Sequence, residues 1–81
     1  MKKRFEKNQI PQGNIQARHE IAEQIHTARK EMNMTQQQLA DLTGTQKSNI
    51  SRMESGRYNP SLDFMVKLAD GLGKKITIAL Q

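Results

Sequence analysis

Residues 35–60 constrain the fold more than any other part of this 81-residue chain. Thr35 is a candidate N-cap, and Gln38 follows three residues later, which is the spacing of a capping box. Gly44 can adopt the left-handed backbone conformation that ends a helix. The segment therefore predicts a short helix that begins at Gln36 and ends in a sharp turn.

A second helix is expected directly after this turn, from Thr45 to Ser55, with Thr45 as its N-cap. Ile50 and Met53 share one face of it, and the remaining positions are mostly polar or cationic. Several of these side chains stand near the N-terminus and are of the types that contact base edges and phosphates in DNA. An ordinary solvated helix hairpin is the alternative, because polar outer faces are common.

The pattern of residues 21–73 resembles the lambda-repressor-like helix-turn-helix family, also called the XRE family. The matching residues are Thr35, Gln36, Leu39, Ala40, Gly44, Ile50, Ser51, Glu54, Gly56, Pro60, Ser61, Leu68, Ala69, Leu72 and Gly73. In such proteins the helix after the turn lies in the major groove, and the helix before it crosses the DNA backbone. The resemblance implies an all-α bundle of four to five helices that binds DNA and regulates transcription.

The resemblance also implies roles for single residues. Lys47, Ser48 and Arg52 match the base-reading positions, and Gln46 and Asn49 can reach bases or phosphates. The residues expected to contact phosphates are Gln36, Thr45, Ser55, Arg57 and Asn59. Arg52 is the sharpest candidate, because its planar guanidinium can pair with O6 and N7 of guanine, whereas Lys47 brings charge with less geometric selectivity. A phosphate contact is the alternative role for Arg52.

Arg29 and Glu54 match a structural ion pair found in several members of that family, so both are expected to belong to the scaffold. If the pair is partly buried, losing one partner strands the charge of the other. His19 and His26 are seven residues apart, too far for the usual i, i+4 metal pair, and the chain has no cysteine. No metal or other cofactor is expected, and no catalytic set can be assembled, so enzymatic activity is not expected.

Two flanking helices complete the expected DNA-binding domain, residues 15–73. The first runs from about Ile15 to Met32, and the last runs from the N-cap Ser61 to about Leu72. The inward residues expected on the first are Ile21, Ile25, Ala28 and Met32, and on the last Leu62, Phe64, Met65, Leu68 and Ala69.

The chain is basic, with a net charge of +5, and the charge is unevenly distributed. Residues 1–14 hold four basic residues and one acidic residue, whereas residues 15–43 hold three basic and four acidic ones. Such asymmetry suits a protein that presents one face to a polyanion, although a basic tail could equally serve solubility. We interpret residues 1–14 as a flexible arm, because Pro11 and Gly13 disfavour helix. The start lacks a hydrophobic leader, so a cytoplasmic protein is expected.

Residues 74–81 change character, since Ile76, Ile78 and Leu80 alternate with smaller or polar residues. This alternation predicts a β-strand. A lone strand needs a partner for its backbone groups, and the same strand of a second subunit is the obvious one. The expected homodimer would place two recognition helices roughly 34 Å apart on a palindromic operator. A frayed tail, or an edge strand that pairs with another protein, is the alternative.

A small XRE-type domain that ends in Leu72, Gly73 and Lys74 and an apolar strand is similar to antitoxins of the HigA and HipB kind. Those proteins repress their own operon and neutralise a co-encoded toxin. The resemblance therefore implies a repressor with two partners, operator DNA and a toxin. A stand-alone or phage-type repressor without a toxin shares the same helices and stays an alternative, as does a helical protein-interaction module that does not bind DNA.

Overall fold

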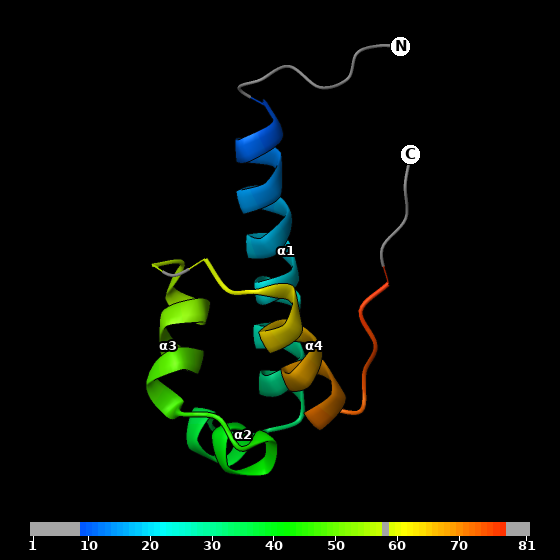
Figure 1. Ribbon diagram of the computed structural model, residues 1–81. Helices are drawn as coiled ribbons and strands as arrows, with labels where there is room; N and C mark the ends of the chain where they lie inside the picture. Colours follow the sequence, from blue (N-terminus) through cyan, green and yellow to red (C-terminus); the bar gives the residue numbers. More distant parts are fainter. Residues whose placement is uncertain (1–8, 58, 78–81) are drawn as a thin grey trace.

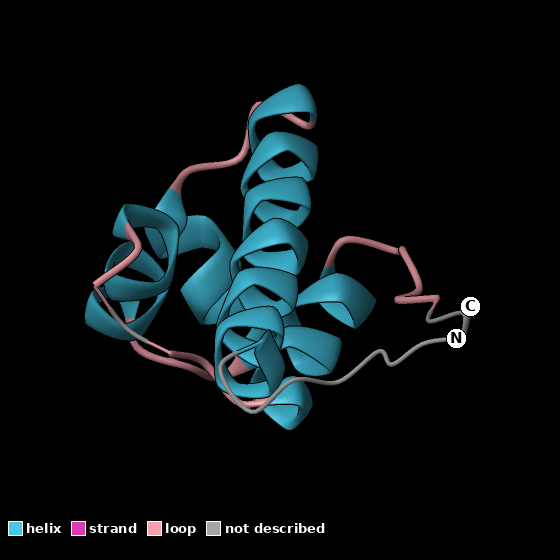
Figure 2. Cartoon of the chain, turned by 90° about the horizontal axis from the view of Figure 1, so that it is seen from above, coloured by secondary structure: helices cyan, strands magenta, loops and turns pink. Residues whose placement is uncertain are grey.

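The computed structural model describes residues 9–57 and 59–77, and it describes side chains from residue 16 onward. Its helices are α1 (Gln9–Glu31), α2 (Gln36–Thr43), α3 (Lys47–Ser55) and α4 (Leu62–Gly71). Helix α1 forms the long axis, with α3 on one side of it and α4 and the C-terminal segment on the other (Figure 1). Seen from above, α3 and the C-terminal segment again lie on opposite sides of α1 (Figure 2). The predicted all-α bundle is confirmed.

The strand expected over residues 74–81 is not confirmed. Its described part, residues 74–77, is loop, and Ile78 and Leu80 lie outside the described residues. A strand is defined by its pairing with a neighbour, and a single copy of this chain offers residues 74–77 no neighbouring strand within the described part.

Helix α1 begins at Gln9, six residues before the expected Ile15. The expectation that Pro11 and Gly13 would keep this region out of the helix was wrong. Pro11 stands in the first helical turn, where backbone N–H groups have no intrahelical partner, so its missing N–H costs no bond there. Gly13 costs only about 1 kcal/mol relative to alanine in a helix interior. Residues 1–8 of the expected arm lie outside the described residues.

The signals around α2 are formed as the sequence predicts. The backbone N–H of Gln38 donates to Thr35 Oγ1 at 3.0 Å, and the N–H of Thr35 donates to Gln38 Oε1 at 2.8 Å. Gly44 ends the helix with φ of 72°. Thr45, however, is not the N-cap of α3, which is Gln46. The N–H of Thr45 still donates to the carbonyl of Ala40 at 3.0 Å, so Thr45 completes the end of α2.

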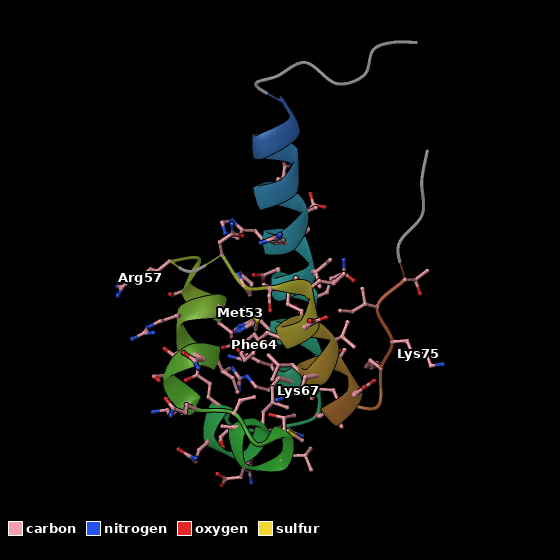
Figure 3. The ribbon with its side chains drawn as sticks, viewed as in Figure 1. Met53, Arg57, Phe64, Lys67 and Lys75 are labelled. Atoms are coloured by element: carbon pink, nitrogen blue, oxygen red, sulfur yellow. The ribbon has the colours of Figure 1, made fainter. Side chains whose placement is uncertain are left out.

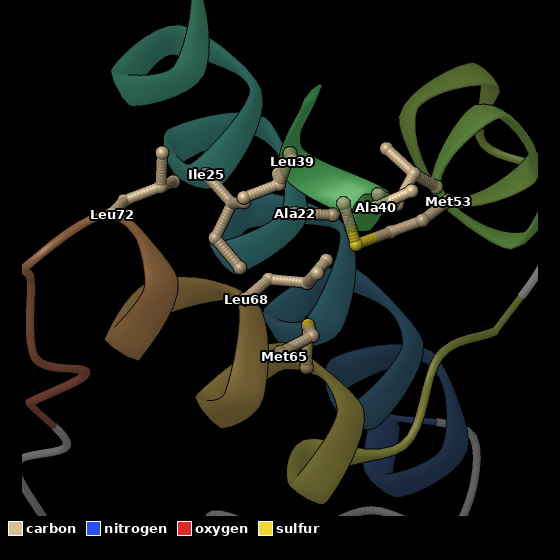
Figure 4. Packing of buried hydrophobic residues seen from close by; sticks show 9 residues of the cluster. Ala22, Ile25, Leu39, Ala40, Met53, Met65, Leu68 and Leu72 are labelled. Carbon is tan, nitrogen blue, oxygen red and sulfur yellow. The ribbon is translucent and has the colours of Figure 1, made fainter. Parts of the chain in front are cut away.

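All four helices contribute to one core (Figure 4). The buried hydrophobic cluster is Ala22, Ile25, Leu39, Ala40, Ile50, Met53, Met65, Leu68 and Leu72. Gly71 allows α4 to approach α2 closely, because a Cβ atom at this position would collide with the methyl group of Thr43. The core fixes the angle at which α3 leaves the turn and therefore which of its faces is exposed.

Two residues expected to point inward, Met32 and Leu62, are exposed at 47 and 42 %, and the apolar Leu42 of α2 is also exposed, at 59 %. Leu42 lies about 110° around α2 from the midpoint of the buried Leu39 and Ala40, at 100° per residue. Met32 follows the last residue of α1, and Leu62 is the first residue of α4, so neither is covered by a neighbouring turn on both sides. Phe64 is partly buried against the core, as expected.

Candidate nucleic-acid interface

One face of α3 is exposed and polar along its whole length. Lys47, Ser48 and Arg52 are exposed on it, while Ile50 and Met53 are turned into the core and are no more than 1 % exposed. At about 100° per residue, Ser48 and Arg52 lie about 40° apart around the helix, and Lys47 lies about 100° from Ser48, so all three fall within an arc of about 140°. The fold therefore brings the three expected base-reading side chains together on one surface.

Ser51 belongs to the same surface, although it was not among the expected site residues. It is exposed and stands one turn after Lys47 and directly before Arg52. The spacing of four residues from Lys47 is the signal by which it could have been found. Ser51 adds a hydroxyl group that can donate to or accept from a base edge.

The flanks of α3 hold the residues that can reach bases or phosphates. Gln46, the N-cap, is exposed and makes no side-chain capping bond, and Asn49 is half-buried. Thr45 is also half-buried, with its hydroxyl oxygen 3.2 Å from that of Thr43. The Ser55 hydroxyl donates to the carbonyl of Arg52 at 3.0 Å, so in this conformation its proton is used within the helix.

The loop after α3 continues the cationic surface. Arg57 and Asn59 are exposed, and Arg57 projects outward beyond the end of α3 (Figure 3). Arg18 reaches the same loop from α1, where its Nη1 donates to the carbonyl oxygen of Pro60 at 3.5 Å. A basic surface of this kind raises the local concentration of a polyanion such as DNA.

Behind α3, Glu54 is the centre of a cluster of polar side chains from three helices. Arg29 Nε donates to Glu54 Oε2 at 2.7 Å, and Arg29 Nη2 donates to Oε1 at 2.9 Å, so the expected ion pair is present and has two parallel hydrogen bonds. Arg29 also donates from Nη1 to the carbonyl of Met34 at 2.6 Å. The side chain of Glu54 is only 4 % exposed.

Two further residues converge on the same carboxylate. Gln36 Nε2 donates to Glu54 Oε1 at 2.9 Å. His26 Nδ1 lies 2.8 Å from that oxygen, at an angle unfavourable for a strong hydrogen bond. Burial raises the pKa of Glu54, but the hydrogen bonds from Arg29 and Gln36, together with the close contact of His26, outweigh it and leave the pKa below its ordinary value. The carboxylate is therefore held as an anion that joins α1, α2 and α3.

Gln36 is the first residue of α2, where the sequence placed a phosphate contact. Its amide nitrogen has two donor hydrogens, and the bond to Glu54 takes only one of them. The second donor hydrogen remains available, and the bond to Glu54 fixes the orientation of the amide that carries it. The amide lies at the N-terminus of α2, where the helix dipole favours an anion. The structure thus ties Gln36, the expected phosphate contact, to the scaffold through Glu54 of α3.

A family model described as helix-turn-helix matches residues 25–78, about two thirds of the chain. This chain belongs to the XRE-type helix-turn-helix family. As a member of that family it is a DNA-binding transcriptional regulator, and the family is not a class of enzymes. Among the described residues, no helix is both long and apolar enough to cross a membrane.

Relatives of this helix-turn-helix protein include regulators and phage repressors. It is 32 % identical over 74 residues to an uncharacterized HTH-type transcriptional regulator of Haemophilus influenzae, an alignment that covers 91 % of this chain and 74 % of the relative. It is 35 % identical over 57 residues to the immunity repressor protein of Bacillus phage phi105, covering 70 % of this chain and 40 % of the repressor. Repressor protein C of Escherichia phage P2 is 44 % identical over 48 residues, covering 59 % of this chain and 48 % of that repressor.

A solved structure is similar over nearly the whole fold. A chain of a toxin–antitoxin module from Streptococcus pneumoniae superposes with a TM-score of 0.67 and 30 % sequence identity. The match covers 95 % of this chain and 83 % of that chain. The likeness therefore includes α1 and the C-terminal segment in addition to the helix-turn-helix.

Proposed function

We propose that this protein is a sequence-specific repressor that acts as the antitoxin of a toxin–antitoxin pair and represses its own operon. The exposed face of α3 carries the DNA-reading part of the proposal, because it concentrates base-contacting side chains that bond to no other described residue. The antitoxin part is supported by the similarity of 95 % of the chain to a chain of a toxin–antitoxin module. In this proposal the toxin contacts a surface away from α3.

Each residue of the α3 surface has a role in the proposed complex. Arg52 pairs with a guanine, and Lys47 and Ser48 contact neighbouring base edges. Gln46 and Asn49 complete the contacts to bases or nearby phosphates. The phosphate contacts come from Gln36, Thr45, Ser55, Arg57 and Asn59. Phosphate contacts fix the register of the protein on the DNA but carry no sequence information. The contacts to bases therefore determine which operator is bound.

The proposed operator is palindromic, and two copies of the protein bind it. Ile76, Ile78 and Leu80 supply the dimer contact in this proposal. Ile76 packs against the core, and Ile78 and Leu80 lie outside the described residues. Two-fold symmetry in the protein would be matched by two half-sites about one DNA turn apart.

The experiment that tests the proposal compares a fragment carrying the protein's own promoter with a shuffled fragment of equal length, at physiological salt. We expect preferential binding to the promoter. Arg52→Ala should remove most of the preference for the promoter. Arg57→Ala, which loses the same charge, should weaken binding to both fragments alike and reduce the salt dependence of that binding. Equal binding of the wild-type protein to both fragments would contradict a sequence-specific autorepressor.

The phage repressors among the relatives favour a second candidate, a stand-alone repressor without a toxin. The two candidates differ in what the neighbouring reading frames encode. Expression of an adjacent frame should arrest growth, and co-expression of this protein should restore it, if the antitoxin proposal holds. A variant such as Arg52→Ala should still restore growth, because the proposed toxin contact lies away from α3. If expression of no adjacent reading frame arrests growth, the antitoxin proposal is wrong and the stand-alone repressor is favoured.

A further inference from the structure

A groove with a volume of about 490 Å³ runs between α1, the end of α4 and the C-terminal segment. Its apolar lining consists of Ile21, Ile25, Ala28, Ala69, Leu72 and Ile76. Figures 1 and 2 place this side of α1 opposite α3. In Figure 3, Lys75 points outward from it and Arg57 points outward from the α3 side. A partner in the groove would therefore leave the DNA-reading face uncovered.

Helix α1 carries more apolar surface than a single copy of the chain buries. Ile21, Ile25 and Ala28 of α1 are spaced four and three residues apart, the spacing of a seam between packed helices, and Met32 follows directly after the helix. Only Ile25 is buried, at 4 % exposed. Ile21 and Ala28 are half-buried along the groove, and Met32 is 47 % exposed. The stripe is thus buried at Ile25 and only partly covered at Ile21 and Ala28, where it borders the groove.

The two rims of the groove carry opposite charges. Glu23 and Glu31 of α1 line one rim, and Lys74 and Lys75 of the C-terminal segment line the other. All four are exposed, and none forms an ion pair with another residue in the described part of the chain. In a two-fold interface the same patch lies on both copies and must complement itself. A patch with one acidic and one basic rim around an apolar centre meets that condition.

We propose that a second copy of this chain occupies the groove. The two copies meet along α1 and the C-terminal segment, so that Glu23 and Glu31 of each copy face Lys74 and Lys75 of the other. This inference rests on the homodimer of the proposed function. It adds the α1 surface and the charge pairs, which set the orientation of the two copies.

Charge reversal tests the pairing directly. Glu31→Lys places like charges across the interface in its own homodimer, and Lys75→Glu does the same with the opposite sign. We expect each variant to self-associate roughly tenfold more weakly than the wild type. An equimolar mixture should recover association, because in the mixed dimer position 31 of each copy again faces an opposite charge at position 75 of the other. Sedimentation over a concentration series measures the association, and circular dichroism confirms that each variant is folded.

Glu20→Lys is the matched control, since Glu20 is exposed on α1 but does not line the groove. It should associate like the wild type. If both reversals associate normally, or the mixture recovers nothing, the groove is not the interface, while promoter binding and the proposed function remain. A wild-type protein that is monomeric at every concentration would overturn the dimer itself. Promoter binding, measured on the same samples, separates these outcomes from a failure of DNA recognition.

Discussion

The two sides of α3 use polar residues for opposite purposes. On the outer side, Lys47, Ser48 and Arg52 are exposed, and their side chains bond to no other residue that the structure describes. On the inner side, Glu54 is 4 % exposed and is contacted by Arg29, Gln36 and His26. Both sides belong to one helix of nine residues.

The difference separates stability from recognition. A buried carboxylate that already has its partners cannot serve a ligand, and removing it leaves other buried groups unpaired. An exposed side chain without internal partners contributes little to folding and is free to bind. Substitutions on the inner side should therefore change the free energy of unfolding, and substitutions on the outer side should change DNA recognition. Gln36 of α2 combines both purposes in the proposed function, since its amide bonds to Glu54 and is also expected to contact a phosphate.

Glu54→Ala should produce the largest loss of stability. Breaking a buried ion pair from one side strands the other charge, here Arg29, and costs about 3–5 kcal/mol. Denaturant unfolding measures this loss. Asp70→Ala, which removes an exposed carboxylate from α4, serves as the control and should change the unfolding free energy by less than about 0.5 kcal/mol. Equal effects of the two substitutions would remove the distinction between the inner side of α3 and an ordinary surface.

Acid should act on the same group with a smaller effect, because a protonated carboxyl group still fills its site. The pKa of Glu54 is lower in the folded protein than its ordinary value of 4.5, so folding favours the ionised form. The resulting stability is complete above about pH 4.5 and is lost as pH falls through the lower pKa of the folded state. Melting temperature should therefore fall more steeply with acid in the wild type than in Glu54→Gln. Parallel plots of melting temperature against pH for the two proteins would show that ionisation of Glu54 does not contribute to the acid dependence of stability.

Arg52→Ala should leave folding nearly unchanged and impair recognition. The loss of one guanine contact reduces discrimination between the operator and a variant operator by about 1–3 kcal/mol. The free energy of unfolding should change by no more than about 0.5 kcal/mol, because the guanidinium makes no bond to another described residue. Titration of both DNA sequences, together with denaturant unfolding, gives the two values. A uniform loss on every sequence would instead assign Arg52 to a phosphate.

Thr35→Ala should give the smallest effect, and on stability alone. The substitution removes the cap of α2 at a cost of about 1 kcal/mol. Glu20→Ala, at an exposed position of α1 that does not line the groove, is the control and should change the unfolding free energy by less than about 0.5 kcal/mol. Operator preference should persist in both variants at a temperature where both are folded. If Thr35→Ala changed operator preference, the cap of α2 would contribute to DNA recognition and not to stability alone.

The local features of this protein could be predicted from the sequence because they depend on neighbours in the chain. The capping box at Thr35 and Gln38, the glycine end of α2 at Gly44 and the cap at Ser61 need only a few adjacent residues to form. The buried face of α3 follows from the spacing of Ile50 and Met53. The start of α1 could not be placed, because Pro11 is unfavourable in a helix interior and acceptable in a first turn.

The sequence by itself determined the helix-turn-helix, its family and the set of polar residues presented by α3. Tertiary structure decided which of those residues are free, because the contacts of Glu54 join three helices that are distant along the chain. It also decided that Leu42 is exposed and that Ile21 and Ala28 border a groove with charged rims. Periodicity locates the apolar face of a helix, but only the packing of other helices against that face determines how much of it is covered.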